Sequence, residues 1–222
     1  MEMKVIARIH TEFPEKFGIP RQSGLAATRG TVVFEPPYRN PDALRGIEGF
    51  SHIWLLWEFS EAVREEWSPT VRPPRLGGNT RMGVFATRSP FRPNPVGLSS
   101  VKLVAVRQDK QYGTVLEVEG ADLMDGTPIY DIKPYLPFAD SHPDATGGFA
   151  DPVREDHLAV VLPAECAAVF TPEQAKTLCE VLAQDPRPSY QEDAARVYGM
   201  AFAGHTVRFR VAGDTLTVCD VE

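Results

Sequence analysis

The sequence predicts a mainly β N-terminal domain, built as a barrel or a sandwich, followed by a small α+β C-terminal domain. Short segments of alternating or strongly apolar residues recur up to about Pro137 and are separated by turns that contain Gly or Pro. This spacing is typical of all-β folds. Because long helical periodicity does not occur in this part, we do not expect the βαβ units of a parallel sheet.

Several segments of the N-terminal part are expected to be strands. Lys4–Thr11 alternates polar and apolar residues, as a half-buried strand does. Phe50–Phe59 (FSHIWLLWEF) is apolar and aromatic, which favours a buried central strand. Pro41–Arg45 is expected to form at most one or two helical turns. The other expected strands are Gly30–Glu35, Met82–Thr87, Val96–Arg107, Gly113–Glu119 and Ile129–Lys133.

The C-terminal part mixes helix and strand signals. Thr171 is a good N-cap and Pro172 suits the first helical position, so a helix is expected from there to about Ala183. Two alternating segments around Ala212-Gly213-Asp214 predict a hairpin. The expected elements besides this helix are a strand at His157–Leu162, a short helix at Ser189–Val197, and the hairpin strands Thr206–Val211 and Thr215–Asp220.

The two parts are separated by a stretch of different composition. Phe138–Glu155 (FADSHPDATGGFADPVRE) is rich in Pro, Gly, Asp and small residues, which is typical of a linker or a long loop. We therefore expect a β domain over residues 1–141, a linker over 142–156 and an α+β domain over 157–222.

The bulk composition indicates an ordinary globular protein. The chain has 222 residues, of which 43% are hydrophobic and 24% charged, so it is long enough to bury a core. The cysteines are odd in number and lack C-x-x-C spacing, which argues against a disulfide framework or a zinc site and favours the cytoplasm. The N-terminus lacks an apolar signal region and no run of about 18 apolar residues occurs, so we expect neither export nor a membrane span.

The charges are distributed unevenly. The net charge is −7, yet no Asp or Glu occurs from Trp67 to Gln108, and the rest of the chain is correspondingly acidic. A positive surface on an acidic body suits a polyanionic partner. Charge alone supports equally the alternative that the cations of this segment form ion pairs with carboxylates from the rest of the chain. The cations of this acid-free segment are Arg72, Arg75, Arg81, Arg88, Arg92, Lys102 and Arg107.

The densest functional signal lies in Val71–Gly97 (VRPPRLGGNTRMGVFATRSPFRPNPVG). Its prolines stiffen loops and its glycines allow close backbone approach, so the interleaved guanidinium groups are held in place for phosphate or carboxylate. Phe85 and Phe91 offer a stacking surface for a base, although an aromatic residue in a strand is more often core. The alternative is a pair of stiff connections with solvated arginines; we favour function, because such loops are rarely mere connections.

A second signal lies in Ala121–Pro137 (ADLMDGTPIYDIKPYLP), where a DGTP turn precedes an expected strand. In a strand, Asp131 and Lys133 point to the same face with Tyr135 nearby, and such a cluster can position or accept a proton. On spacing alone an exposed Asp–Lys pair of little energy is the better interpretation. The polar loop Pro20–Leu25 is weaker evidence for ligand binding.

Several common site motifs do not occur. The sequence has no G-x-G-x-x-G, G-x-x-x-x-G-K-[ST] or G-x-S-x-G, so neither a Rossmann cofactor site nor a P-loop or esterase site is supported. The histidines at positions 10, 52, 142, 157 and 205 do not have metal-ligand spacing. We therefore expect no metal.

The same segments together resemble the TrmO/TsaA-like family. The matching stretches cover most of the first 141 residues, and the long arginine/proline block is highly specific. They are PRQSGL (20–25), RGIEGFSHIWLL (45–56), PTVRPPRLGGNTRMGVFATRSPFRPNPVGLS (69–99), DLMDGTPIYDIKPYLPFADS (122–141) and AQDPRPSY (183–190).

The resemblance implies a methyltransferase that uses S-adenosyl-L-methionine (SAM) and is built on a β-barrel rather than a Rossmann sheet. It implies methylation of N6 of N6-threonylcarbamoyladenosine (t6A) beside the anticodon of tRNA, giving m6t6A. It also implies a homodimer with the cofactor near the interface. Carried over by motif, the residues that contact SAM are Gln22, Ser23, Gly24, Ser60, Glu61, Ala62, Arg88, Leu98, Gly120, Ala121, Asp122 and Leu123.

A mechanism follows as a hypothesis from both lines of argument. Methyl transfer mainly requires proximity and orientation, and a base must take the N6 proton. The candidate bases are Asp125 and Asp131, with Lys133 and Tyr135 orienting the threonylcarbamoyl group. Two rivals stay open: a non-catalytic RNA-binding or regulatory module that keeps a nucleotide-like ligand, and an enzyme that uses the Asp–Lys pair on a small anionic substrate. The residues expected to hold tRNA phosphate or the threonyl carboxylate are Arg72, Arg75, Arg81, Arg92 and Asn94.

Overall fold

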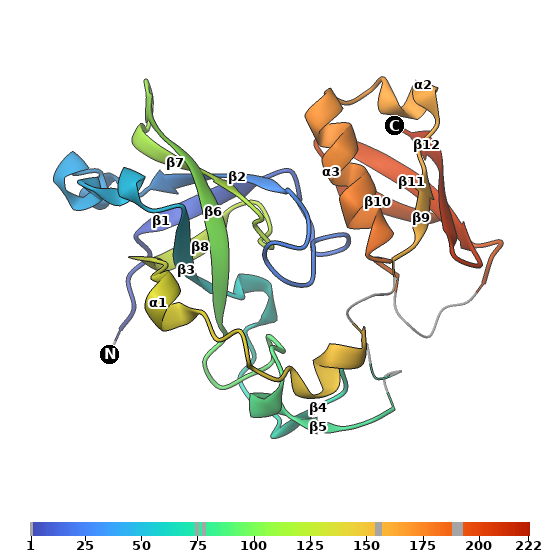
Figure 1. The fold of residues 1–222 in the computed structure, drawn as a ribbon, viewed down its shortest axis with the longest axis horizontal. Helices are drawn as coiled ribbons and strands as arrows, with labels where there is room; N and C mark the ends of the chain where they lie inside the picture. The colour runs from blue at the N-terminus through green and yellow to red at the C-terminus, as the bar shows by residue number, and fades with distance from the viewer. Residues whose placement is uncertain (1, 74–75, 77–78, 154–156, 188–192) are drawn as a thin grey trace.

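The computed structural model describes residues 2–73, 76, 79–153, 157–187 and 193–222. The side chains of 151–153 are outside this description. In Figure 1 a β-barrel stands beside a smaller sheet that carries helix α3, and a lobe containing strands β4 and β5 projects from the barrel. The expected combination of a β N-terminal domain and a small α+β C-terminal domain is confirmed.

The N-terminal domain is a closed barrel with strand order β1-β2-β7-β6-β3-β8. Every neighbouring pair is antiparallel, including the pair β1–β8 that closes the sheet. A barrel is therefore formed and the sandwich alternative is excluded. The strands are β1 (Ala7–Thr11), β2 (Arg29–Phe34), β3 (His52–Glu58), β6 (Val96–Asp109), β7 (Gly113–Glu119) and β8 (Thr127–Pro134).

Alternation along these strands fills the barrel with apolar side chains. In β3 the residues Ile53, Leu55 and Trp57 are buried, and the residues between them face outward. Ile9 and Leu116 are fully buried in the same core. Because a residue in register with its neighbour points to the same side of the sheet, the outward residues of β3, β6 and β8 form a continuous outer face.

The antiparallel order places three long connections at one end of the barrel, which we call the loop end. Neighbouring strands alternate in direction, so β1, β7 and β3 all finish where β2, β8 and β6 begin. The connections are residues 12–28, 120–126 and 59–95. Segments that are far apart in the sequence thus meet in space.

The described residues of the range 59–95 form the lobe, in which β4 (Thr70–Val71) pairs with β5 (Met82–Gly83). The expected strand over Met82–Thr87 is wrong beyond Gly83, because a 3₁₀ helix covers Val84–Ala86. Val84 is fully buried and its N–H donates to the Pro69 carbonyl over 2.9 Å. The buried Val84 turns the chain inward where a strand would continue.

The C-terminal domain packs helix α3 (Pro172–Ala183) on a sheet of order β10-β11-β12-β9. The helix is confirmed, and Thr171 forms a capping box with Gln174. The expected hairpin and the strand near residue 160 are confirmed, and β9 runs parallel to β12. The remaining elements are β9 (Ala159–Val161), α2 (Ala164–Ala167), β10 (Tyr198–Phe202), β11 (His205–Ala212) and β12 (Thr215–Val221).

The segment before β11 differs from expectation. Of the expected helix Ser189–Val197, residues 189–192 lie outside the described residues, and 193–197 form a turn in which Asp193 accepts the Ala195 N–H at 2.9 Å. Strand β10 was missed. It pairs with β11 through a tight turn whose Ala203 and Gly204 have φ of 51° and 81°, and burial alternates along it, with Gly199 at an exposed position.

The stretch between the domains contains short helical turns. Helix α1 covers Pro137–Asp140 and a 3₁₀ helix covers Gly148–Val153. The Trp54 indole N–H donates to the Asp140 carboxylate at 3.0 Å, which ties α1 to β3. The expected boundaries at 141 and 157 stay predictions. Among the described residues, no helix is both long and apolar enough to cross a bilayer.

The close approach of Gly97 to Trp57 gives a stability prediction. A Cβ at Gly97 would lie 2.2 Å from Cε2 of the Trp57 ring, so Gly97→Ala forces a buried indole to move. We expect a loss of about 1–3 kcal/mol in the free energy of unfolding, measured by urea denaturation. Gly49→Ala is the control, because a Cβ there meets nothing within 4 Å. Equal stability of the two variants would contradict the packing argument.

Candidate functional site

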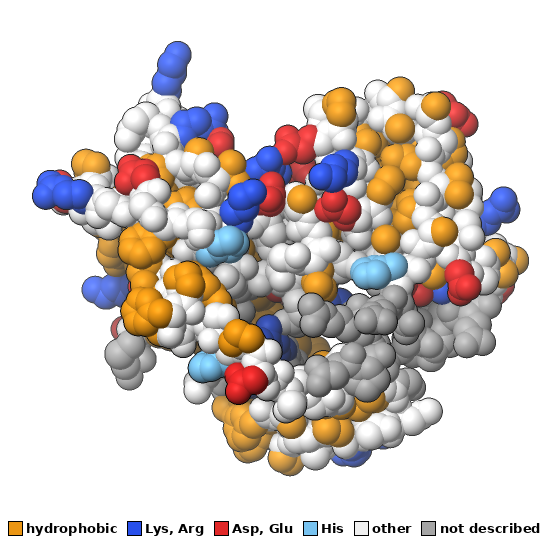
Figure 2. All heavy atoms as spheres, viewed as in Figure 1, with side chains coloured by type: hydrophobic (Ala, Val, Ile, Leu, Met, Phe, Trp, Pro, Cys, Tyr) orange, Lys and Arg blue, Asp and Glu red, His pale blue; other side chains and the backbone are white. Residues whose placement is uncertain are grey.

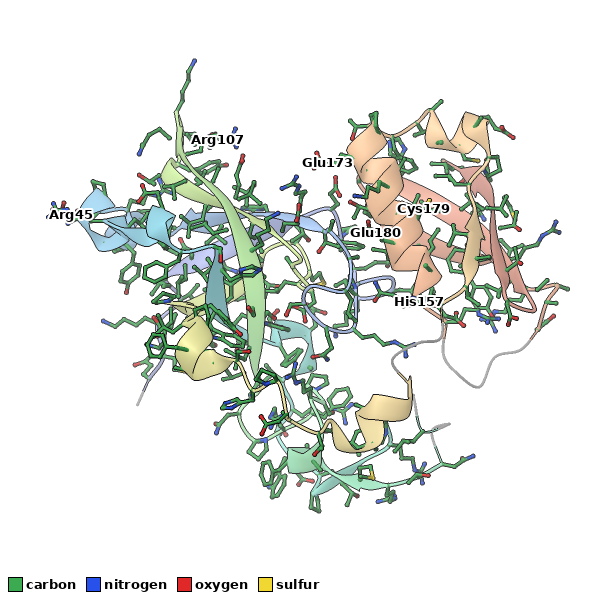
Figure 3. All side chains as sticks on the ribbon, in the orientation of Figure 1. Arg45, Arg107, His157, Glu173, Cys179 and Glu180 are labelled. Carbon is green, nitrogen blue, oxygen red and sulfur yellow. The ribbon has the colours of Figure 1, made fainter. Side chains whose placement is uncertain are left out.

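Helix α3 of the C-terminal domain holds the loop 12–28 by its backbone. The Glu180 carboxylate accepts the Ala27 N–H at 2.8 Å, and the Thr177 hydroxyl donates to the Ala27 carbonyl at 3.3 Å. The Gln184 amide donates to the Leu25 carbonyl at 3.1 Å. Figure 3 shows Glu173 and Glu180 on the side of α3 that faces the barrel. Side chains of one domain therefore fix a loop of the other.

Apolar contacts complete this attachment. Phe13, which follows β1, is buried in the C-terminal core with its ring centroid 5.3 Å from that of Phe202. Gly18 has φ 94°, and a Cβ there would lie 2.0 Å from the Met200 sulfur. Ala26 is buried in the same core. The loop 12–28 thus belongs to the barrel by sequence and to the C-terminal domain by packing.

Two glycines bring the loop against the β7–β8 connection. The Gly24 N–H donates to the Gly120 carbonyl at 2.9 Å. Their φ values are 77° and 86°, in the left-handed region that favours glycine. A Cβ on Gly120 would lie 3.2 Å from the Gly24 Cα, so a side chain there would push the backbones apart. The structure therefore joins two segments that the resemblance assigned to the cofactor.

Polar side chains surround this contact. The Arg88 guanidinium donates to the Gln22 side-chain oxygen, which brings the lobe to the loop. The Ser99 hydroxyl donates to the Asp122 carboxylate at 2.5 Å, and the Trp57 indole donates to the Ser99 oxygen at 2.9 Å. Burial raises the pKa of Asp122, and the Ser99 hydrogen bond and the Arg88 charge oppose this rise only in part. We call Gln22–Gly24, Arg88 and Gly120–Asp122 the cofactor cluster.

Other residues that the resemblance assigned to the cofactor lie in the 3₁₀ helix after β3 and on β6. Ser60 and Glu61 are exposed and Ala62 is buried in a 3₁₀ helix, and the Lys16 ammonium donates to the Glu61 carbonyl at 2.8 Å. Leu98 is exposed on the outer face of β6, next to Ser99.

Ala121 and Leu123 are buried, and the hydroxyls of Thr28 and Thr11 donate to their carbonyl oxygens. These two residues therefore shape the connection and do not present side chains to a ligand.

The chemistry of the cluster fits SAM. A guanidinium such as that of Arg88 suits the cofactor's carboxylate, and a carboxylate such as that of Asp122 suits its hydroxyl, ammonium or sulfonium groups. The space beside Gly24 is open, because a Cβ there meets nothing within 4 Å. A cavity of about 190 Å³ lies elsewhere, between residues 16–21 and the end of α3.

The candidate catalytic residues fall into two places. Lys133 contacts Asp131 at 3.0 Å on the outer face, as the strand period predicted, and the Tyr135 ring lies 5.6 Å from that of Trp54. Asp125 instead sits at the loop end, where it contacts His10 Nδ1 and accepts the Thr11 N–H, both at 3.1 Å. Thr127 and Asp131 are four positions apart in β8, about 13 Å along the strand. Asp125 precedes Thr127 at the loop end, so the two carboxylates do not share a site.

The cations of the acid-free segment behave in two ways. Lys102 and Arg107 on β6 pair with Glu119 and Glu117, so the alternative of pairing with carboxylates holds for them. In the lobe, no described arginine from Arg72 onward forms an ion pair among the described residues.

Arg81 and Arg92 of the lobe donate hydrogen bonds to neutral oxygen atoms. Arg81 donates to the Thr70 hydroxyl at 3.1 Å, and Arg92 donates to the carbonyls of Thr87 and Ser89 at 3.2 and 3.4 Å. Arg72 and Asn94 are exposed. Arg75 lies outside the described residues.

Comparison with known families decides the relationship. Residues 8–141 match the family of the tRNA-methyltransferase O N-terminal domain, and residues 155–222 match the TrmO C-terminal domain. The chain belongs to the TrmO family. The resemblance inferred from the motifs is thereby confirmed.

Individual TrmO relatives cover nearly the whole chain. The tRNA (adenine(37)-N6)-methyltransferase of Escherichia coli (strain K12) is 45% identical over 219 residues, 95% of this chain and 93% of the relative. A putative S-adenosylmethionine-dependent methyltransferase RcsF of Pseudomonas aeruginosa is 43% identical over 88% of this chain and 86% of its own length. The crystal structure of TrmO from Pseudomonas aeruginosa superposes with a TM-score of 0.80 at 35% identity, covering 100% of this chain and 98% of that one.

Sequence reasoning missed the residues that support this cluster. Ser99 and Trp57 are 42 positions apart, and Glu180 is 153 positions from Ala27. No local pattern links such pairs. Only Gly97, which Trp57 packs against, left a trace in the sequence as a glycine inside a strand.

The raised pKa of Asp122 predicts a pH-dependent stability. A raised pKa means that the folded chain binds this proton more tightly than the unfolded chain, so the contribution of Asp122 to stability falls as pH rises through that window. We expect Asp122→Asn to unfold at a higher temperature than the native chain at neutral pH. The difference should shrink on acidification through the native pKa. Thermal denaturation without ligand measures this, and a difference that grows on acidification would contradict it.

The attachment of the loop to α3 predicts a remote effect on cofactor binding. Glu180→Ala leaves the Ala27 N–H without its acceptor, which costs about 1–3 kcal/mol. We expect weaker SAM binding in calorimetric titration, with the circular dichroism of the barrel unchanged. Lys176→Ala is the control, since it removes the Lys176–Glu180 ion pair and keeps the bond to Ala27. Native SAM affinity in Glu180→Ala would exclude this coupling.

Proposed function

We propose that this chain transfers a methyl group from SAM to N6 of t6A beside the anticodon of tRNA, giving m6t6A. The observation that carries the proposal is the meeting of the loop 12–28, the lobe and the β7–β8 connection at Gln22–Arg88 and Gly24–Gly120. This meeting supports a cofactor site beside the arginine-rich lobe. The name of the Escherichia coli relative, a tRNA (adenine(37)-N6)-methyltransferase, supports methylation of N6 of a tRNA adenine.

The chain's part in cofactor binding is to hold and orient. Bound SAM supplies a methyl group on a sulfonium, which a nitrogen lone pair can displace. Arg88 would bind a carboxylate, and Asp122 would face a cationic or hydroxyl group. The pairing of Asp122 with a cation would offset the unfavourable burial of its charge. The closely packed Gly24 and Gly120 backbones fix the site before the substrate arrives.

We assign the proton acceptor to Asp131 on positional grounds. In register across the outer face, Leu98 is paired with Leu56, and Leu56 with Asp131. Two strand spacings make this about 10 Å, a distance that a substrate placed over Leu56 would bridge. Bound SAM would supply the methyl group and retain the electron pair of its C–S bond, and Asp131 would accept the proton of N6. Lys133, 3.0 Å from that carboxylate, would then bind the threonyl carboxylate, with Tyr135 beside it.

The lobe arginines complete the proposed substrate site. Arg72, Arg81 and Arg92 would contact tRNA phosphates, together with Arg75 and Asn94. In the described lobe these guanidinium groups bond only neutral partners, so their charges are available to a polyanion.

We further propose a homodimer that covers the exposed Leu98, and a cytoplasmic location, where tRNA is modified.

A single-turnover assay with nucleoside mass spectrometry tests the proposal. With SAM and tRNA that contains t6A, the native chain should yield a nucleoside heavier by one methyl group; tRNA with unmodified adenine should react far more slowly. Asp131→Asn should lower the rate by about 10²–10⁴-fold and leave calorimetric SAM binding intact. Asp42→Asn is the control, since Asp42 also pairs with a cation, Arg45, on the outer surface.

Each failure has a separate meaning. Full activity in Asp131→Asn would remove this residue from the mechanism. Equal rates on the two tRNAs would overturn the assignment of t6A. SAM binding without any methylated product would favour the non-catalytic RNA-binding module.

A further inference from the structure

The lobe displays a pair of stacked aromatic side chains to solvent. Trp67 and Phe85 are 51% and 72% exposed, and their ring centroids lie 6.0 Å apart with an interplanar angle of 28°. Trp67 precedes β4 and Phe85 lies in the 3₁₀ helix after β5, so pairing of β4 with β5 brings them together. Exposed apolar surface of this kind is unfavourable in water and marks an interaction site.

The ring of Phe91 differs from those of Trp67 and Phe85 because one of its faces is covered. The Arg64 guanidinium lies 3.7 Å above the Phe91 ring centroid, a cation–π contact that occupies one ring face. Phe91, one of the two aromatics that the sequence suggested for stacking, is therefore engaged within the protein. Phe85, the other, retains an open surface and gains Trp67 as an unforeseen partner.

The position of the pair relates it to the cofactor cluster. Phe85 precedes by three positions Arg88, which bonds Gln22. Three residues of extended chain span at most about 11 Å. The backbone of Phe85 therefore lies no farther than this from that of Arg88, a member of the cofactor cluster. In Figure 2 hydrophobic side chains gather on the surface where Figure 1 places β4 and β5.

The charge around the pair indicates the occupant. Both aromatics lie in the acid-free segment at one end of the β4–β5 pair, and Arg72 and Arg81 are exposed at its other end. Trp67 also borders a cavity of about 130 Å³ that is lined by Arg64 and Arg92 and by Glu65 and Glu66. A flat apolar surface with flanking cations suits a nucleobase and its phosphates, and the mixed donors and acceptors of the cavity suit the polar edge of a base.

We propose that Trp67 and Phe85 form a stacking platform for an unpaired nucleobase of the tRNA loop that carries the methylated adenine. The inference rests on the proposed function in that tRNA is the substrate. Bases in a duplex are stacked on each other and offer no free face, whereas loop bases splay out and stack on aromatic side chains. The platform therefore selects loop over stem, and the arginines bind either one.

Binding of an anticodon stem–loop RNA with an unmodified loop tests the platform without methyl transfer. We expect Trp67→Ala and Phe85→Ala each to weaken its affinity by about 5- to 150-fold. Trp67→Phe and Phe85→Tyr should restore most of it. Tyr112→Ala is the control, because this aromatic lies on the β6–β7 hairpin at the opposite end of the barrel. SAM affinity should stay unchanged in all variants.

A second RNA and a salt titration sharpen the result. A fully paired RNA duplex should bind the alanine variants and the native chain equally. The slope of log affinity against log salt should stay native in these variants and fall in Arg72→Ala, which removes a phosphate contact.

Stem–loop affinities within twofold of native would overturn the platform. Equal losses on duplex and loop would also overturn it, as would variants that change only self-association in sedimentation velocity, which would assign the pair to a contact between copies. Because these measurements involve no methylation, they stand even if t6A proves not to be the substrate.

Discussion

The hydrogen bonds from α3 to residues 25–27 determine where the cofactor cluster can form. Glu180 and Gln184 contact this backbone only because the C-terminal sheet has buried Phe13 and placed α3 alongside the loop. A connection as long as 12–28 would otherwise sample many conformations and lose considerable entropy when it becomes ordered. The C-terminal domain supplies that order, so the barrel and its neighbour together make one site that neither sequence segment contains alone.

Barrel closure supplies the second constraint. An antiparallel closed sheet sends alternate connections to opposite ends, so the loop 12–28, the lobe and residues 120–126 must share one end. The proposed cofactor site would therefore not need the glycine-rich turn of a Rossmann fold. Its anchors are instead left-handed glycines in two separate connections, held together by a hydrogen bond between their backbones.

The local patterns of the sequence predicted much of the fold. Strand β7, the helix from Pro172 and the final hairpin follow from alternation, capping and turn chemistry, all of which act between near neighbours. The strand expected after Gly83 failed because a tertiary contact, burial of Val84, overrides local preference. The candidate cofactor residues were predicted from family motifs. The chain of hydrogen bonds through Trp57, Ser99 and Asp122 could not be predicted from the sequence, because it depends on register between distant strands.

The segregation of charge between lobe and body has a kinetic consequence. The lobe carries six arginines and three glutamates on a chain whose net charge is −7, so its own net charge is +3 and that of the rest of the chain is −10. A polyanion that approaches from the acidic side is repelled, and one that approaches the lobe is attracted, so most productive encounters begin in the correct orientation. Such preselection raises the association rate at low ionic strength and limits the time that an RNA spends on unproductive faces of the protein.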